Sequence, residues 1–517
     1  MRQQTWWLVA VGLVAAIPAG AQLPALGVPR GVFRLELGGE FNNADSRYND
    51  GAVEDIARSF TAPMLGGGYF PALRDAESRI ARILGSPSYQ YNLGRVSANG
   101  LINIGTGTIG LSYGLTRRIT VFAVAPIVQT RRQIRILVDS SGADAGFNPA
   151  DPVFGTAAGR SETAQFFTDF DGALTTLSQK IANGDYDANP TQKAQAQAAL
   201  ADGTLLRDDL AAVLGDPQTP FAPTLSSAAG AAVINAVTSL QNTFTGLSVG
   251  GFASLPALAD ARLSRDDYEG FVSNPAGPVA GFPLVEANLS RIGDMETGVV
   301  FTVVDRWNRP GRPGGFRTAL EARFRLPTGL VDQPANFLDI GTGSGHFAAR
   351  VRGVMDLGAG RVGLRLAGSW EHVFPATLTR RVAPPTQAIA YANTEADVRE
   401  SPGSTLEILA APFFRLVSTL GLQAGVRYRR HGQDSYAFAS ASSGVPAGAD
   451  VLGRSSDWTT TSVMGGITYV SPAVDDPAST SLPVEAFWTI EGPVHGSGGI
   501  VAKERIARMG LRVYVRP

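Results

Sequence analysis

The sequence predicts an all-β transmembrane protein: a closed antiparallel up-and-down β-barrel of the outer-membrane type, with about twelve strands (range roughly 10–14) and an inserted α-helical segment. Three observations predict this fold. Many segments alternate apolar and polar side chains, the connections between them are short and long in turn, and the chain begins with an export signal.

The first 21 residues have the pattern of a secretory signal peptide. An apolar run follows the basic Arg2, and small residues before Gln22 form a cleavage site. No later segment has the roughly 18 uninterrupted apolar residues that a transmembrane helix needs. We therefore expect the mature chain in the outer membrane, in contact with lipid and with the barrel-assembly machinery.

The composition excludes several classes of function. The 517 residues contain no cysteine, which excludes a disulfide scaffold, a thiol nucleophile and a cysteine-ligated metal site. Charged residues make up only 17% and glycines number 60, as expected when many side chains face lipid and many turns are tight. The formal net charge of −1 indicates no surface for nucleic acid.

The clearest strand extends from Gly315 to Pro327, where apolar side chains and Thr318 occupy the even positions, and three arginines and a glutamate are at odd ones. Successive side chains of a strand point to opposite faces, so one face suits lipid and the other water. The same alternation predicts twelve strands: 32–41, 108–115, 119–137, 294–304, 315–327, 347–357, 362–374, 406–416, 420–431, 458–470, 484–490 and 505–515.

The connections support a barrel independently. Short joints at 116–118, 358–360 and 417–419 fall between the long connections 42–100, 138–290, 328–345, 375–404 and 432–457. Outer-membrane barrels have short periplasmic turns and long outer loops. An even number of strands also returns both ends of the chain to the periplasmic side.

Two of the long connections contain helical patterns. Residues 71–84 predict a short helix that ends at Gly85. The segment 138–290 contains three amphipathic stripes, one of them introduced by Asn189 and Pro190 as an N-cap and first-turn proline. We expect a small helical bundle that either caps the outer mouth or plugs the lumen. The chain is thus divided into the signal 1–21, strands one to three with a long outer loop (22–137), the helical insertion (138–290) and strands four to twelve (291–517).

Two patterns could indicate an enzyme. Residues 338–345 look like the glycine-rich motif of S-adenosylmethionine-dependent methyltransferases, but an alternating strand follows them where that motif needs a helix. A hydrolase triad could draw on His372 and Ser369, but no motif places them together. The four histidines have no metal-ligand spacing. We therefore predict no catalytic residues, no cofactor and no metal.

The charged face of the strands is the candidate functional surface. Parity directs these charged candidates toward the lumen: Arg34, Glu36, Arg317, Glu321, Arg323, Arg325, Arg350, Arg352, Arg365, Glu407, Arg415, Arg427, Arg429 and Arg512. One interpretation is that they pair across neighbouring strands and hold the barrel in shape. The other is that arginines line a path for anionic or polar solutes. Both can hold together.

Outward-facing aromatic residues near strand ends fit the girdles of a membrane barrel, although in a soluble β-protein they would form the core. They are Phe41, Tyr113, Trp370, Phe414, Tyr428, Tyr469 and Trp488.

Four phrases of the sequence, at 113–118, 293–296, 325–329 and 339–345, together resemble the bacterial outer-membrane barrels grouped as the phenol-degradation meta-pathway or transporter-like family. The resemblance implies a barrel of about this size that admits small hydrophobic or aromatic compounds, and it supplies no catalytic residues. We predict an outer-membrane channel or transporter for the passive passage of small solutes. The alternative is a barrel-anchored surface-binding or structural protein that displays a helical cap.

Overall fold

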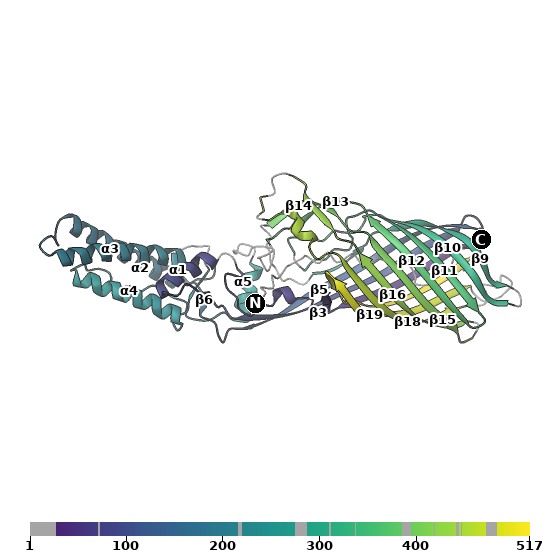
Figure 1. The fold of residues 1–517 in the computed structure, drawn as a ribbon, viewed down its shortest axis with the longest axis horizontal. Coiled ribbons are helices and arrows are strands. Elements are labelled where there is room, and N and C mark those ends of the chain that lie inside the picture. Colours follow the sequence, from purple (N-terminus) through teal and green to yellow (C-terminus); the bar gives the residue numbers. More distant parts are fainter. Residues whose placement is uncertain are drawn as a thin grey trace.

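The computed structural model describes residues 27–70, 73–215, 220–274, 287–309, 312–336, 338–384, 394–417, 419–440, 444–445, 447–471 and 483–516. Within these residues the chain forms a closed barrel of twelve antiparallel strands, which confirms the predicted fold class (Figure 1). The strands, in their order around the barrel, are β1 (Phe33–Ala44), β4 (Arg95–Gly114), β5 (Ile119–Asp139), β9 (Glu296–Arg309), β10 (Arg312–Arg325), β11 (Ala348–Ala359), β12 (Val362–Val373), β15 (Thr405–Arg415), β16 (Leu420–His431), β18 (Trp458–Val470), β19 (Val484–Gly498) and β21 (Arg505–Val515).

Pairing of the first and last strands closes the ring. Glu36 of β1 lies opposite Arg512 of β21, and the other edge of β1 pairs with β4. The barrel has a short-turn end, where residues 115–118, 360–361 and 416–419 connect strands and where β21 ends, and an opposite long-loop end. Among the described residues, no helix is both long enough and apolar enough to cross a membrane.

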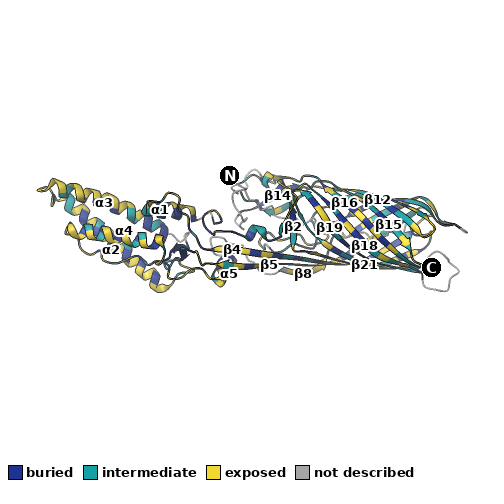
Figure 2. Ribbon diagram, turned by 60° about the horizontal axis from the view of Figure 1, so that its bottom comes forward, coloured by how far each residue is buried: buried dark blue, intermediate teal, exposed yellow. Residues whose placement is uncertain are grey.

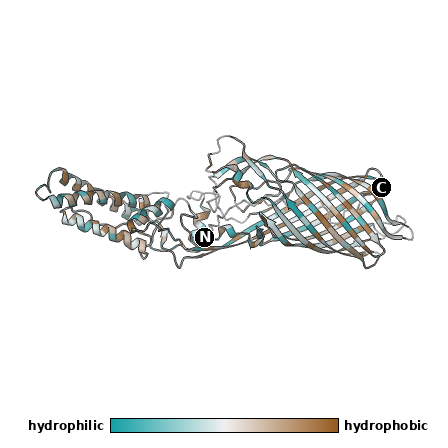
Figure 3. Ribbon diagram, in the orientation of Figure 1, coloured by the Kyte–Doolittle hydropathy of each residue, from teal (hydrophilic) through white to brown (hydrophobic). Residues whose placement is uncertain are grey.

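Side chains alternate between the two faces of the barrel wall. On β10, Leu320 is 50% exposed while the neighbouring Glu321 is 7% exposed, and Figure 2 shows the same banding along the other strands. Figure 3 shows apolar positions spread along the strands of the wall. The predicted outward aromatics are exposed except Tyr113, which is half-buried because Phe33 covers it at 4.6 Å between ring centroids. An apolar exterior of this kind suits lipid.

Strands β4 and β19 are much longer than predicted: β4 begins at Arg95, not Thr108, and β19 continues to Gly498, not Ile490. Strand β5 ends at Asp139, close to the predicted end, so β4 and β5 pair along their whole lengths as a ribbon. The first half of β4 is rich in small and polar residues, which weakens the apolar alternation on which the prediction depended. Beyond the part paired with β1, the ribbon continues past the long-loop end (Figure 1), and β8 (Ala287–Ile292) pairs with its flank.

A helical bundle lies at the far end of this ribbon, outside the barrel (Figure 1). Its helices are α1 (Arg74–Leu84), α2 (Ala157–Ala182), α3 (Pro190–Leu210), α4 (Ala228–Gly246) and α5 (Arg265–Ser273), with a π-helical turn at Ala211–Gly215. The Asn189 side chain accepts a hydrogen bond from the Gln192 N–H and caps α3, with Pro190 in the first turn. The inserted helical segment of the prediction is therefore present.

The bundle, here called the cap, has a hydrophobic core of its own. Phe166 and Phe170 of α2 pack with Val237 and Phe244 of α4. The same core also includes buried residues from the connection between β1 and β4, among them Phe60, Leu65, Leu73 and Tyr91. Two segments far apart in the sequence thus fold into one unit, and α1 is part of this core.

Shorter elements complete the long-loop end and the base of the cap. They are β2 (Ser46–Asn49), β3 (Ala52–Asp55), β20 (Ile500–Ala502), β13 (Ala376–Arg381), β14 (Glu395–Ser401), β17 (Ser435–Phe438), β6 (Ala145–Phe147), β7 (Phe221–Pro223) and the 3₁₀ turns Arg58–Phe60 and Ala449–Gly453. The sheet β13-β14-β17 lies above the barrel mouth in Figure 1.

Candidate functional site

The inward face of the barrel carries a layer of ion-paired side chains toward the long-loop end, here called the charged layer. Its members are Glu40, Glu296, Glu321, Arg323, Arg325, Arg350, Glu371, Glu407, Arg427, Arg429, Glu491 and Arg508. Alternation along each strand places them on one face, and the register between neighbouring strands sets which of them meet.

Each carboxylate of this layer meets at least one guanidinium group. Arg323 bridges Glu296 at 2.5 Å and Glu321 at 2.8 Å. Glu371 of β12 accepts from Arg325 at 3.3 Å and from Arg350. The pairs join β9, β10, β11 and β12, so they hold four neighbouring strands in register.

The strongest convergence is at Glu491 of β19, whose side chain is 1% exposed. Arg508 reaches it at 2.7 Å, Arg427 at 3.1 Å and Arg429 at 3.4 Å. Arg508 also pairs with Glu40 of β1 at 2.6 Å. Because these residues come from both ends of the chain, the network spans the closure of the barrel.

On six of the strands, β9 to β12, β15 and β18, small and apolar residues lie between the charged layer and the short-turn end. This apolar layer comprises Val300, Ala319, Val354, Ala367, Leu409, Ala411 and Met464. Sequence reasoning missed it because parity was used to assign only charged residues to the lumen. The signal was present for six of the seven, since each of them shares the parity of the charged residues on its own strand, whereas β18, which carries Met464, has no charged residue.

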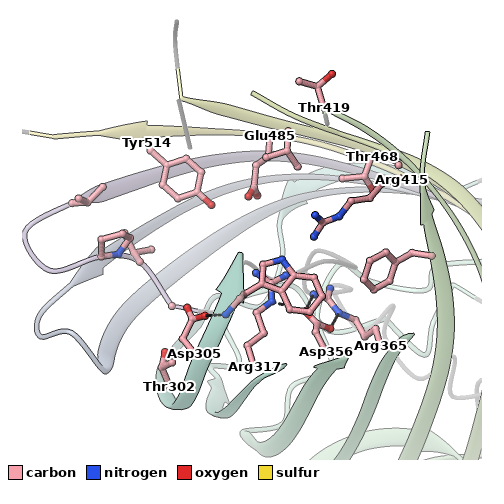
Figure 4. A pocket seen from close by; sticks show the side chains of 18 of the residues that line it. Thr302, Asp305, Arg317, Asp356, Arg365, Arg415, Thr419, Thr468, Glu485 and Tyr514 are labelled. Carbon is pink, nitrogen blue, oxygen red and sulfur yellow. Dashed lines mark hydrogen bonds and ion pairs between the residues drawn. The ribbon is translucent and has the colours of Figure 1, made fainter. Parts of the chain in front are cut away.

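A cavity of about 620 Å³ occupies the barrel interior at the short-turn end (Figure 4). Its wall includes Arg317, Asp356, Arg365 and Arg415, and the N-terminal segment 27–32 lines another side. Arg317 pairs with Asp356 at 2.8 Å, and Arg365 pairs with the same carboxylate at 2.6 Å. Asp356 is therefore held by two guanidinium groups from the neighbouring strands β10 and β12.

An aromatic ring lies among these arginines. The guanidinium carbon of Arg317 is 4.7 Å from the centroid of Trp307, that of Arg415 is 5.3 Å away, and the ring of Phe413 is 6.1 Å away. Cations at such distances from an indole face are attracted to it electrostatically. The cavity therefore combines aromatic faces with fixed positive charge.

Trp307 was missed by sequence reasoning because the predicted strand ended at Val304. In the structure β9 continues to Arg309, and its register against β10 shifts between the pairings of Thr318 and Ala319. A bulge of this kind changes which face successive residues point to. It places Asp305 and Trp307 in the cavity wall, where simple alternation from Glu296 would have directed them outward.

The N-terminal segment is held in the mouth of the barrel by backbone contacts. The Val28 N–H donates to the Thr120 hydroxyl at 2.7 Å, and the Gly31 N–H donates to the Gly114 carbonyl at 2.8 Å. Val28 and Val32 pack with Tyr514 as a small buried cluster. This segment covers part of the short-turn end.

Twelve of the fourteen predicted lumen candidates form ion pairs in the structure: Arg34, Glu36, Arg317, Glu321, Arg323, Arg325, Arg350, Arg365, Glu407, Arg427, Arg429 and Arg512. Arg512 meets both Glu36 and Glu485, at 3.0 and 3.1 Å. Arg352 lies opposite Glu321 in the β10–β11 pair and is attracted by Glu321 and Glu407. Arg415 contacts the Trp307 ring in the cavity wall.

At the long-loop end, three of the four sequence segments that carry the family resemblance, 293–296, 325–329 and 339–345, fold together around Asp294. These three segments are here called the loop knot. The Asp294 carboxylate accepts from the backbone N–H groups of Gly329 and Ser344 and from the Ser344 hydroxyl, at 2.8 to 3.0 Å. The Thr328 hydroxyl also donates to the Gly293 carbonyl at 2.8 Å. The glycine-rich segment 338–345 is thus part of a structural loop, and β11 follows it where a methyltransferase would have a helix.

Ion pairs tie this knot to the sheet above the mouth. Arg380 of β13 pairs with Asp332 at 2.8 Å and with Glu400 of β14 at 3.0 Å. Burial alone would raise the pKa of Glu400, but the His346 imidazole, 3.7 Å away, and the charge of Arg380 outweigh it and lower that pKa. Ile340 of the knot packs against the buried cluster that contains Ile102 and Ile104 of β4, so the loop is anchored to the barrel wall.

The proposed hydrolase pair is not assembled. Alternation along β12 directs Ser369 inward and His372 outward. The His372 ring lies 5.8 Å from Trp370 and 4.9 Å from Phe374, among the outward aromatics.

No protein-family model and no curated protein matches the chain. Among solved structures, the fold is distantly similar to an outer membrane channel from Pseudomonas putida F1, with 7% identity and a TM-score of 0.43 over 96% of this chain and 100% of that one. It is also distantly similar to the transport unit of the autotransporter AIDA-I from Escherichia coli (7% identity, TM-score 0.35, 97% and 95% covered) and to the P. putida toluene transporter TodX (10% identity, TM-score 0.26, 94% and 89% covered). With its apolar exterior and charged interior, this chain has the fold of an outer-membrane β-barrel.

Proposed function

We propose that the protein is an outer-membrane channel or transporter for the passive passage of small solutes, including hydrophobic or aromatic compounds. The observation that carries this proposal is the 620 Å³ cavity inside the barrel, together with the position of the cap outside it. A barrel built only as an anchor needs no internal space at its periplasmic end, whereas a solute path does.

In this proposal the path begins at the outer mouth beside the loop knot, crosses the charged layer and the apolar layer, and ends in the cavity. The fourteen predicted lumen residues line it or hold its wall. The apolar layer, which includes Ala319, Ala367 and Ala411, is packed in the structure, so in this proposal it is the constriction that a solute must open. Charged rings and apolar constrictions are the elements from which selective pores are built.

The proposal also specifies the location of the chain and its orientation in the membrane. Residues 1–21 direct export, the barrel-assembly machinery inserts the mature strands into outer-membrane lipid, and the segment 138–290 is presented at the outer surface. The long-loop end then faces outward, because the short turns of such barrels face the periplasm.

A cysteine-accessibility experiment tests the channel directly, since the chain has no cysteine of its own. Ser369→Cys places a thiol on the lumen side of β12, and Gly368→Cys places one on the lipid side at the adjacent position. In planar bilayers we expect discrete single-channel currents. A charged methanethiosulfonate reagent should lower the conductance of the Ser369→Cys protein and leave that of Gly368→Cys unchanged. A folded protein that conducts no current would contradict the proposal.

The alternative, a barrel that anchors and displays the cap, draws support from the extensive pairing of the charged layer and from the separate core of the cap. Paired charges can close a lumen and stabilise an anchor. This function predicts no current from the full-length protein, and none after the pairing at Glu491 is broken by Glu491→Gln.

A further inference from the structure

We propose that the short-turn cavity is a binding site for small aromatic anions, with a single-ring aromatic carboxylate as the ligand class. The inference rests on the proposed channel function for the route by which the ligand arrives. The chemistry of the cavity wall indicates the class of solute.

The charge of the wall is the first argument. Among the described residues that line the cavity, six are arginines, namely Arg30, Arg117, Arg317, Arg365, Arg415 and Arg516. Three lining residues are acids, Asp305, Asp356 and Glu485, which leaves a formal excess of three positive charges (six minus three). Asp356 is already held by two of the arginines, and Glu485 pairs with Arg512, which is not part of the wall.

The charged layer differs in this respect. It contains six arginines and six glutamates, so its formal charges cancel. Arg352, which lies opposite Glu321, adds one positive charge at this level, against the formal excess of three at the cavity. The larger excess of positive charge therefore lies at the short-turn end. Arg30, Arg117 and Arg516 are exposed at the rim of the cavity, whereas Arg317, Arg365 and Arg415 belong to the strands of the wall. The excess positive charge at the rim attracts anions toward the cavity.

The aromatic side chains are the second argument. Trp307, Phe413 and Tyr514 all line the cavity, and the Trp307 ring is flanked by the guanidinium groups of Arg317 and Arg415. Figure 4 shows these two arginines on the cavity wall. A ligand ring can pack against the aromatic faces while its carboxylate accepts hydrogen bonds from a guanidinium group. Arginine suits this role because its planar fork matches a carboxylate and also stacks on rings.

The size of the cavity fits such a ligand. Its volume of about 620 Å³ lies within the range of roughly 300–1,000 Å³ that is usual for small-molecule sites. A neutral hydrocarbon would leave the excess positive charge uncompensated, and an inorganic anion would not use the rings. Only a ligand with both a ring and a negative charge satisfies both features of the wall.

Isothermal titration calorimetry of the full-length protein in detergent micelles tests the inference. The probes are benzoate, benzyl alcohol, which keeps the ring without the charge, and acetate, which keeps the charge without the ring. We expect benzoate to bind at least about tenfold more tightly than either of the other two, because a tenfold ratio needs only one good polar contact. Equal binding of benzoate and acetate, or of benzoate and benzyl alcohol, would overturn the proposal.

Two variants locate the site. Arg415→Gln and Trp307→Leu should each weaken benzoate binding at least about fivefold, because each removes one of the two recognition elements. Arg118→Gln is the matched control, since Arg118 is an exposed arginine at the same end of the barrel that does not line the cavity. Circular dichroism and heat-modifiable migration on gels establish that each variant is folded. Benzoate binding that survives both substitutions in folded protein would place the site elsewhere.

Bilayer recordings of the same preparations separate this inference from the channel proposal. Current without preferential benzoate binding rejects the aromatic-anion site and keeps the channel. Benzoate binding without current keeps the site and rejects the channel.

Discussion

Asp294 and Ser344 are 50 residues apart in the chain, yet one carboxylate oxygen of Asp294 accepts from both the backbone N–H and the hydroxyl of Ser344, at 2.8 and 2.9 Å. The other oxygen accepts from the Gly329 N–H at 3.0 Å. Three phrases that seemed separate in the sequence are therefore one loop knot at the outer mouth. Glycines permit it, because a Cβ at Gly343 would lie 2.5 Å from the Asp294 carboxylate.

Removing the Asp294 carboxylate should open the knot. Asp294→Ala leaves two backbone N–H groups without their acceptor, and hydrogen bonds to charged groups contribute about 1.5–3 kcal/mol each. We expect amide hydrogen exchange in residues 326–347 to accelerate at least about tenfold while exchange in β10 and β11 stays unchanged. Asp450→Ala, at an exposed carboxylate on another loop, should have no such effect. Unchanged exchange in the knot would show that other contacts hold it.

The barrel should depend strongly on Glu491. Glu491→Gln removes the charge that faces Arg427, Arg429 and Arg508, and breaking a buried ion pair from one side costs about 3–5 kcal/mol. The temperature at which the folded band disappears on gels should therefore fall clearly. Glu162→Gln, on an exposed position of α2, is the control and should change stability by less than about 0.5 kcal/mol. Equal melting of both variants would contradict a structural role for the network.

The cap should be less stable as the pH rises. Burial raises the pKa of Glu77 above its ordinary value of 4.5, although the backbone N–H groups of Gly67 and Tyr91 act in the opposite direction. The folded cap therefore binds the proton more tightly than the unfolded chain. Its extra stability is fully present below pH 4.5 and is lost as the pH rises through the folded pKa. Asp144, whose pKa burial also raises, acts in the same direction.

Thermal melting of the full-length protein at 222 nm, from about pH 4 to about pH 8, measures this dependence. Glu77→Gln retains the oxygen that accepts from both N–H groups and should reduce the slope. Glu77→Ala should lower cap stability at every pH, by about 1–3 kcal/mol for each N–H left without an acceptor. A pH dependence that Glu77→Gln leaves intact would assign it to other groups.

Gly114 should be required for the N-terminal segment to remain in the barrel mouth. A Cβ there would lie 2.0 Å from the Pro29 carbonyl oxygen and 2.5 Å from that of Val28. Gly114→Ala should displace the segment without opening the barrel. In a Val28→Cys background, which supplies the only thiol, labelling should accelerate at least about tenfold.

Gly105→Ala on the same strand is the matched control, because a Cβ there meets only the Phe41 ring at 3.8 Å. It should leave the labelling rate of Val28→Cys unchanged. Slow labelling in both backgrounds would show that the segment tolerates the added methyl group.

Strands β10 and β9 show how much of the fold could be predicted from the sequence. The strand from Gly315 to Pro327 was predicted within three residues at each end of β10, because lipid on one side and polar groups on the other impose an unbroken period of two. Strand β9 was recognised but cut short, because the bulge near Val304 interrupts that period just before Trp307. The prediction therefore did not include Asp305 and Trp307, which line the cavity.

By itself the sequence determined the class of the fold, since the alternation of apolar and polar side chains is a local feature that a membrane barrel requires in every strand, and the lengths of the connections can be read directly from the chain. Only the tertiary structure decided which charges meet, where the cap lies and where a cavity remains. Arg508 and Glu40 are 468 residues apart, and their contact exists because the last strand closes on the first. Closure, register and a single bulge are properties of the whole ring, and no local window of sequence contains them.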